Sequence, residues 1–217
     1  MLRRSSAFLL ALLGLSVLLA VPAPAQAAGT CVLSAPGRVA IGRPYIGLKL
    51  TMSGPCSYAA WDLYHPTRGW QDITIFDNTT TDTWDVYSFH TIGTHTWRPG
   101  GAWDVNYDDQ AQNQPTSTVK LAAGAWISSS RSGDVVTLKG TSLLYSVSNN
   151  NYFKRSAGGV FQFRERGTTQ WQNLKSVWTN SRGEATMSYR SSKIRDYRFA
   201  LYSTSISWDL GSAVTTR

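Results

Sequence analysis

Short β-rich runs separated by turn residues constrain this sequence more than any other feature. Val, Ile, Thr, Tyr, Phe and Trp gather in runs of about four to ten residues, which is the usual length of a strand. Gly, Pro, Asn, Asp and Ser lie between the runs, as in Ser53-Gly54-Pro55 and Pro99-Gly100-Gly101. Neither half of the 217-residue chain shows a helical period of apolar residues. The pattern therefore predicts an all-β protein.

The expected strands fall into two groups. The first half contains six runs of this kind, at Tyr45–Met52, Ser57–Tyr64, Ile73–Phe76, Trp84–Phe89, Thr94–Arg98 and Thr116–Leu121. The second half contains seven, at Ala125–Ser129, Val135–Leu144, Val160–Arg166, Gln170–Thr179, Ala185–Tyr189, Tyr197–Ser203 and Ser207–Val214. Seven short strands in about a hundred residues are typical of an immunoglobulin-like sandwich. Strand alternation places Phe161 and Phe199 inward and Arg164 outward.

The second half also resembles a known class of domain. The residues that carry the resemblance are the run Val160–Arg166, then Trp171, Leu174 and Val177, the turn Thr179–Gly183, and finally Tyr197-Arg198-Phe199. With these residues, the stretch from about Val119 to Arg217 is similar to immunoglobulin-like domains appended to secreted actinobacterial proteins. The resemblance implies a spacer or a binding module, and no catalytic signature belongs to it. The first half resembles no family, so we predict its sandwich from the strand pattern alone.

The N-terminal segment has the features of a secretory signal peptide. Arg3 and Arg4 precede an uncharged apolar run, Ala7–Val21, and Ala25-Gln26-Ala27 supplies a small-x-small cleavage signal. A membrane anchor is the alternative, but the run is shorter than the roughly 20 residues that span a bilayer. We therefore expect cleavage after Ala27 and a secreted, extracellular mature chain without an integral membrane segment.

The chain has two cysteines, Cys31 and Cys56. Two cysteines cannot build a disulfide-framework miniprotein or a cysteine-rich zinc module. In an oxidising compartment a pair of thiols usually forms a bond, so we expect a disulfide between them. The alternative interpretation of either cysteine is a reactive catalytic thiol.

Charge divides the chain into two unlike halves. The net charge is +8, but residues 28–119 carry five Lys or Arg and eight Asp, a net charge of −3. Residues 120–217 carry fourteen Lys or Arg and five Asp or Glu, a net charge of +9. The polar stretch Gln110–Pro115 lies near the seam and has the composition of a linker. We therefore expect a signal peptide at 1–27, an N-terminal β-sandwich containing the disulfide at 28–116, and a C-terminal immunoglobulin-like sandwich at 117–217. The basic half could also dock on the acidic half.

Catalytic residues form no complete motif in the sequence. The histidines are His65, His90 and His95, and neither Gly-x-Ser-x-Gly nor His-Glu-x-x-His is present. The histidines could share a metal, or they could be polar residues beside a turn. Paired aspartates could serve a glycosidase, but solvated surface aspartate is the simpler interpretation. We predict that the chain is not an enzyme, with a hydrolase as the remaining alternative.

One acidic segment begins like a calcium loop. Asp104, Asn106 and Asp108 supply oxygen ligands at alternate positions. The pattern then departs from the EF-hand, because Asp109 stands where Gly is needed and Pro115 where Glu is needed. We expect no cofactor and no firm metal site, with calcium at these three residues as the candidate and a solvated acidic loop as the alternative.

Aromatic and arginine side chains are the best candidates for binding. Trp, Tyr and Arg are the residues that most often anchor interfaces, and exposed rings beside carboxylates also suit stacking on sugars. The candidates are Trp70, Trp84, Trp103 and Tyr107 in the first half and Arg164, Arg166, Arg198 and Tyr202 in the second. If the immunoglobulin-like strand order holds, the three arginines share one outward patch with Tyr202.

The sequence favours a non-catalytic interaction protein, either an adaptor or an accessory subunit of an extracellular assembly. The expected partner is an extracellular protein. Binding to a cell-wall polymer or another polysaccharide is the first alternative, and inhibition of a secreted protease is the second. An extracellular location argues against nucleic acid as the target of the basic half.

Overall fold

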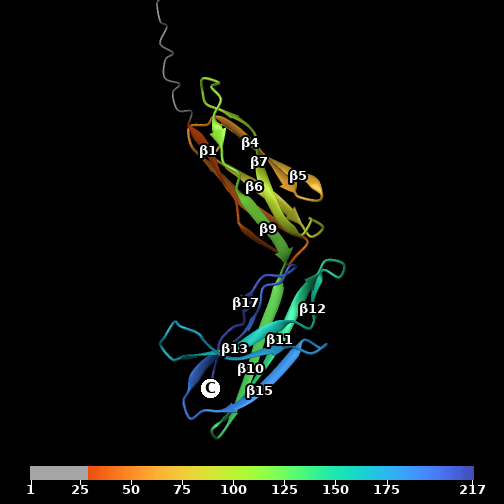
Figure 1. Cartoon of the computed structure of the whole chain (residues 1–217), viewed down its shortest axis with the longest axis vertical. Coiled ribbons are helices and arrows are strands. Elements are labelled where there is room, and N and C mark those ends of the chain that lie inside the picture. Colours follow the sequence, from red (N-terminus) through yellow and green to blue (C-terminus); the bar gives the residue numbers. More distant parts are fainter. Residues whose placement is uncertain (1–28) are drawn as a thin grey trace, which may run out of the picture.

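The computed structural model describes residues 29–217, and every regular element in this part of the chain is a β-strand. The predicted signal peptide, residues 1–27, lies outside the described residues. Two β-sandwiches stand end to end along the long axis of the molecule (Figure 1). No helix in residues 29–217 has the length and apolarity that crossing a bilayer requires.

The first sandwich consists of two sheets. Its smaller sheet has the order β6-β3-β1-β8, from strands β1 (Thr30–Ser34), β3 (Tyr45–Ser53), β6 (Thr81–Tyr87) and β8 (Ala111–Gln112). Its larger sheet has the order β2-β9-β7-β4-β5, from β2 (Arg38–Ile41), β4 (Tyr58–His65), β5 (Gly69–Asp77), β7 (Gly93–Trp103) and β9 (Thr116–Leu121). Most neighbouring strands pair antiparallel, while β2 pairs parallel with β9 and β1 pairs parallel with β8. This is the Greek-key arrangement of an immunoglobulin-like domain.

The second sandwich repeats the arrangement. In one sheet β11 (Val135–Ser146) pairs with β10 (Ala123–Ser132), β12 (Asn151–Lys154) and β15 (Glu184–Arg190). In the other sheet β14 (Gln172–Trp178), β13 (Gly158–Glu165), β16 (Arg195–Leu201) and β17 (Leu210–Gly211) follow in order, and β18 (Thr215–Thr216) also pairs with β16. The predicted fold class, two tandem immunoglobulin-like sandwiches, is confirmed.

Alternating burial explains why these segments form strands. In β16 the buried residues are Tyr197, Phe199 and Leu201, and the residues between them are half-buried. These three pack with Phe161 and Leu138 into the core of the second sandwich. The predicted inward and outward positions of this half are therefore correct.

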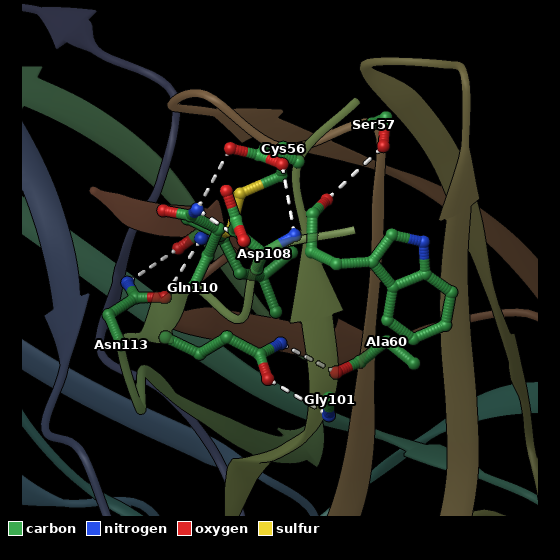
Figure 2. The surroundings of a disulfide bond; sticks show 12 residues. Cys56, Ser57, Ala60, Gly101, Asp108, Gln110 and Asn113 are labelled. Carbon is green, nitrogen blue, oxygen red and sulfur yellow. Dashed lines mark hydrogen bonds between the residues drawn. A yellow bond between two sulfur atoms is a disulfide. The ribbon is translucent and has the colours of Figure 1, made fainter. Parts of the chain in front are cut away.

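The core of the first sandwich is built around tryptophan. Trp61 and Trp97 are fully buried, and Trp61 meets Phe76 edge-on at 5.9 Å. The predicted disulfide is confirmed: Cys31 on β1 bonds to Cys56, which lies two residues before the start of β4. Figure 2 shows the surroundings of this bond. The Gln112 side chain there bridges β4 and β7, because it donates to the Ala60 carbonyl and accepts from the Gly101 amide.

Strand pairing places the first domain boundary later than predicted. Strand β9 pairs with both β2 and β7, so the first sandwich extends to Leu121 and the second begins after Ala122. The stretch Gln110–Pro115, predicted to be a linker, lies inside the first domain. There the Trp61 indole donates to the Asn113 carbonyl at 2.9 Å, and the Asn113 amide bonds to the backbone of Leu33. Asn and Gln residues are common both in linkers and where side-chain amides bond to buried backbone groups. The composition of this stretch therefore could not distinguish a linker from a segment inside the domain.

Trp208 joins the two sandwiches. Its indole donates to the Val39 carbonyl at 2.8 Å, and the cationic groups of Arg38 and Lys120 each lie 4.3 Å from its ring centroid. Arg38 also pairs with Asp209 at 2.7 Å. At this contact the acidic half contributes the arginine and the basic half the carboxylate, so the Arg38–Asp209 pair is opposite in sign to the net charges of the two halves.

Candidate binding site

The outward side of the larger sheet in the first sandwich carries two of the predicted aromatic residues, Trp70 and Trp103. At one end Tyr58 pairs with Trp103 on β7 and with Asp77 on β5. At the other end Tyr64 pairs with Trp70. We call this surface the aromatic face and define it by its ring and branched side chains: Tyr58, Tyr64, Trp70, Ile73, Ile75 and Trp103. The large exposed side chains among them are Trp70, Ile73 and Ile75.

A hollow of about 530 Å³ lies at the Trp103 end of the aromatic face. The rings of Tyr58 and Trp103 stack there with centroids 3.9 Å apart and planes 7° apart. The remaining lining residues are mostly polar or aromatic, namely Ser57, Asp77, Asn78, Val105 and Tyr107. Two of the predicted binding residues, Trp103 and Tyr107, therefore line the same hollow.

The loop after Trp103 presents Tyr107 to solvent. This side chain is 81% exposed, and its backbone has a φ of 66°, which is uncommon for a residue with a side chain. The Asp104 carboxylate holds the loop by accepting hydrogen bonds from the amides of Asn106 and Asp108 at 2.8 and 3.1 Å. Gln110 donates to the same carboxylate at 3.3 Å. Asp104 thus acts as a turn-forming residue.

The calcium candidate at Asp104, Asn106 and Asp108 remains a prediction. The Asp104 oxygens serve the turn, and Asn106 contributes its backbone amide to that turn. Among residues 29–217 no three or more His, Cys, Asp or Glu side chains gather in a way that could hold a metal.

The opposite end of the aromatic face is fixed by two polar contacts. The Trp70 indole donates to the Asp62 carboxylate at 2.9 Å, so a 53% exposed ring has a defined orientation. The Arg98 guanidinium lies over the Tyr64 ring at 4.3 Å from its centroid. Trp70 was predicted as a binding residue, and the structure places it on the same sheet face as Trp103.

Trp84 is not available to a ligand. It is only 2% exposed and meets the Trp97 ring edge-on at 5.3 Å in the core of the first sandwich. The prediction that it takes part in binding is therefore wrong. In β6 it alternates with exposed residues and points inward, whereas the exposed rings on this side of the domain are Tyr45, Tyr87 and Phe89. Sequence reasoning missed these three, although alternation from Trp84 would have placed Tyr87 outward.

Two of the three arginines predicted in the second sandwich, Arg164 and Arg198, lie over the same tryptophan ring. Gln162 pairs with Arg198 across β13 and β16, and Arg164 pairs with Asp196. The guanidinium groups of Arg164 and Arg198 lie 4.8 and 4.3 Å from the centroid of the Trp171 ring. We call this surface the arginine face, consisting of Gln162, Arg164, Trp171, Asp196, Arg198 and Tyr202.

Both arginines of the arginine face are hydrogen-bonded across the sheet, and Arg164 also forms an ion pair. Arg164 donates to the Asp196 carboxylate at 3.1 Å, and Arg198 donates to the Gln162 amide oxygen at 2.7 Å. A hydrogen bond from Thr216, and then Arg164, lower the pKa of Asp196.

The other predicted residues of this half lie around the arginine pair. Arg166 follows the end of β13 and is exposed. The hydroxyl groups of Tyr202 and Ser176 form a hydrogen bond of 2.9 Å. Trp171, which carries this stack, was not among the predicted binding residues.

Two of the histidines form a pair in the first sandwich. The His65 and His95 rings lie 5.0 Å apart, while His90 stacks on Phe89 in a separate turn. His95 is buried, its Nδ1 contacts the Gly93 carbonyl, and its Nε2 has no hydrogen-bond partner. Burial, and then His65, lower the pKa of His95.

The histidine pair predicts a loss of stability in mild acid. The unfolded chain takes up a proton on His95 near its ordinary pKa of about 6.5, whereas the folded chain resists protonation. The free energy of unfolding should therefore fall as the pH drops below about 6.5. We expect His95→Gln to flatten this dependence in urea titrations between pH 7.5 and 5. The half-buried His90 serves as the control, and His90→Gln should retain the slope of the parent chain. If the two variants behave alike, His95 is not the cause.

Comparison with known proteins assigns no family. No family model matches the sequence, and no curated protein matches it. Escherichia coli alpha-2-macroglobulin is similar to 90% of this chain at 10% identity and a TM-score of 0.44, and the chain spans 14% of that protein. The fibronectin(III)-like modules of Clostridium thermocellum CbhA match 85% of this chain and 90% of theirs, at 11% identity and a TM-score of 0.37. The D00-D0 domain of intimin matches 86% and 98%, at 14% identity and a TM-score of 0.30. Likeness at this level supports no conclusion, so the fold assignment depends on the strand pairing itself.

Proposed function

We propose that this chain is a secreted, non-catalytic interaction protein, an adaptor that binds an extracellular protein through the arginine face. The observation that carries the proposal is that the guanidinium groups of Arg164 and Arg198 both lie over the Trp171 ring, at 4.8 and 4.3 Å from its centroid. Trp, Arg and Tyr dominate the energetics of protein interfaces, and Tyr202 belongs to the same face. Sandwich domains of this architecture serve many functions, so the argument depends on this surface rather than on the fold.

The arginine face suits an acidic partner. The ionised groups of this face are two arginines, Arg164 and Arg198, and one carboxylate, Asp196. Stacking on Trp171 and pairing across the sheet hold the side chains of Arg164 and Arg198 in place before binding. A surface that is already ordered loses less conformational entropy when a partner docks.

The contact between the sandwiches supports an adaptor. Trp208, Arg38 and Asp209 join the two bodies through a ring, an indole hydrogen bond and an ion pair. Tyr145, on β11 of the second sandwich, is also buried within the core of the first. The connection therefore presents two different faces on one scaffold, which is the property an adaptor needs.

Partner binding should depend on the stacked arginines. We expect Trp171→Ala, and separately Arg164→Gln with Arg198→Gln, to weaken capture of the partner from culture supernatant by at least about 30-fold, which corresponds to 2 kcal/mol for an interface anchor. The exposed Arg182→Gln, on a turn away from this face, is the matched control and should bind normally. Rising salt should weaken the parent chain more than the double variant. Equal binding by all four proteins would show that the arginines are merely solvated.

A further inference from the structure

We infer that the aromatic face of the first sandwich binds a neutral saccharide chain, which lies along β4 from the Trp103 end to the Trp70 end. This inference goes beyond the proposed function, because it concerns a different domain and a different ligand. It depends on the position of the rings, on the polar groups between them and on the rigidity of the hollow.

The rings form two stations at opposite ends of one sheet face. Tyr58 and Trp103 make the first station, while Tyr64 and Trp70 make the second. The strand rise of about 3.3 Å per residue separates residues 58 and 64 by roughly 20 Å. The apolar C–H faces of sugar rings stack on flat aromatic rings. Two stations at this separation suit an oligosaccharide better than a single sugar.

The surface between the stations is low and open. Ala60 pairs with Gly101 on one side and with Ile75 on the other, so two of the three side chains in this row are small. A β-carbon added at Gly101 would meet no atom within 4 Å, which shows that the space above it is free. Ile73 and Ile75 provide exposed apolar area beside this space. A chain of sugar rings could therefore lie flat on the sheet.

Polar groups lie beside the rings where sugar hydroxyls would be. Asp77, Asn78 and Ser57 line the hollow next to Tyr58 and Trp103. Asp62 accepts the Trp70 indole hydrogen at the other station. Carboxylates and amides can bond to two neighbouring hydroxyls at once, and a mixture of aromatic rings with a few such groups is typical of small-molecule sites.

The hollow is held in shape by unusual backbone. Among residues 29–217 only three non-glycine residues have positive φ, and two of them, Asn78 and Tyr107, line this hollow. The Asn78 amide donates to the Ser57 carbonyl at 2.7 Å, and the Tyr107 amide donates to Asp104 at 3.1 Å. Strained residues of this kind persist where the surroundings fix them, and they concentrate at binding sites.

The charge pattern distinguishes a neutral saccharide from other ligands. The ionised groups on or beside the aromatic face are Asp62, Asp77 and Arg98, so an anionic polymer would meet a net negative surface. Protein interfaces gather their anchors at the centre and deplete it of charge. On the aromatic face the rings lie at the two ends, and the charged Asp62 lies between the two stations. A protein ligand is therefore the less favoured occupant and becomes an outcome of the test.

Affinity gel electrophoresis tests the inference on residues 28–217. The gels contain one neutral polysaccharide each: β-glucan, xylan, mannan, soluble chitin or α-glucan. We expect at least one to retard the protein, and Trp103→Ala or Trp70→Ala to weaken that retardation at least 10-fold. Tyr107→Ala, on the exposed loop, should weaken it without affecting the fold. The matched control is Trp126→Ala, a 64% exposed tryptophan of the second sandwich, which should run like the parent chain.

The remaining outcomes either contradict the saccharide or separate it from the adaptor. The inference is wrong if no gel retards the parent chain, or if Trp70→Ala and Trp103→Ala are retarded as strongly as Trp126→Ala. If the protein partner of the arginine face is lost in Trp103→Ala and kept in Trp171→Ala, the aromatic face is a protein interface. If the gels still retard the Arg164→Gln, Arg198→Gln variant and the parent chain captures no protein partner, the saccharide is supported and the adaptor is contradicted. A monosaccharide that competes as well as a hexasaccharide would contradict the extended site.

Discussion

Removing the disulfide, by Cys31→Ala with Cys56→Ala, should lower the free energy of unfolding by about 3.5 kcal/mol. The bond closes a loop of 25 residues, and this is the chain entropy that the unfolded state regains for that loop length. Typical domains are stable by about 5–15 kcal/mol, so the loss is a large part of the total. Urea unfolding followed by tryptophan fluorescence measures it, with reductant added to the parent chain as a second route to the same state.

The loss should fall on the first sandwich, because both cysteines belong to it. The matched control is Ser57→Ala, next to the bridge, which removes one hydrogen bond from the Ser57 hydroxyl to the Trp103 carbonyl. It should cost no more than about 1 kcal/mol. If the double cysteine variant loses as little free energy of unfolding as Ser57→Ala, the bridge does not stabilise the domain by restricting the conformational entropy of the unfolded chain.

The fold was largely predictable from alternation and turn residues. Strands with a clear apolar alternation, such as β11 and β16, lie close to their expected ranges. Two early strands, β1 and β2, were missed because each has only two inward residues and Pro36-Gly37 lies between them. Strand β12 was missed for a different reason: all four of its residues are exposed, so no alternation marks it. Its pairing with β11 is a tertiary effect that local sequence does not encode.

The candidate site was only partly predictable, because it depends on strand register. The Trp70 ring is exposed and the Trp103 ring is half-buried, and their common sheet face follows from β4 lying between β5 and β7. A bulge between Leu63 and Tyr64 brings Trp70 opposite Tyr64, and a bulge shifts which side chains share a face. Trp171 was missed because it precedes its strand, so only the neighbouring β13 and β16 place arginines against it.

Trp61→Ala should cost about 3–5 kcal/mol, the usual range for removing a large aromatic side chain from a core. Trp61 is fully buried, stacks edge-on against Phe76 and donates to the Asn113 carbonyl, so the change leaves both a cavity and an unpaired buried acceptor. Trp61→Phe keeps part of the ring and should cost less. Urea unfolding measures both variants.

Trp70→Ala is the natural counterpart, because the two tryptophans lie on adjacent strands of one sheet and face opposite ways. Its ring is 53% exposed, so truncation should change the free energy of unfolding by only about 0.5 kcal/mol while weakening saccharide retardation. A large stability loss in Trp70→Ala would mean that the ring supports the domain rather than a ligand. Residues of the same type, nine positions apart, thus separate packing from recognition: Trp61→Ala should destabilise the domain by about 3–5 kcal/mol, and Trp70→Ala should leave its stability nearly unchanged while weakening saccharide binding.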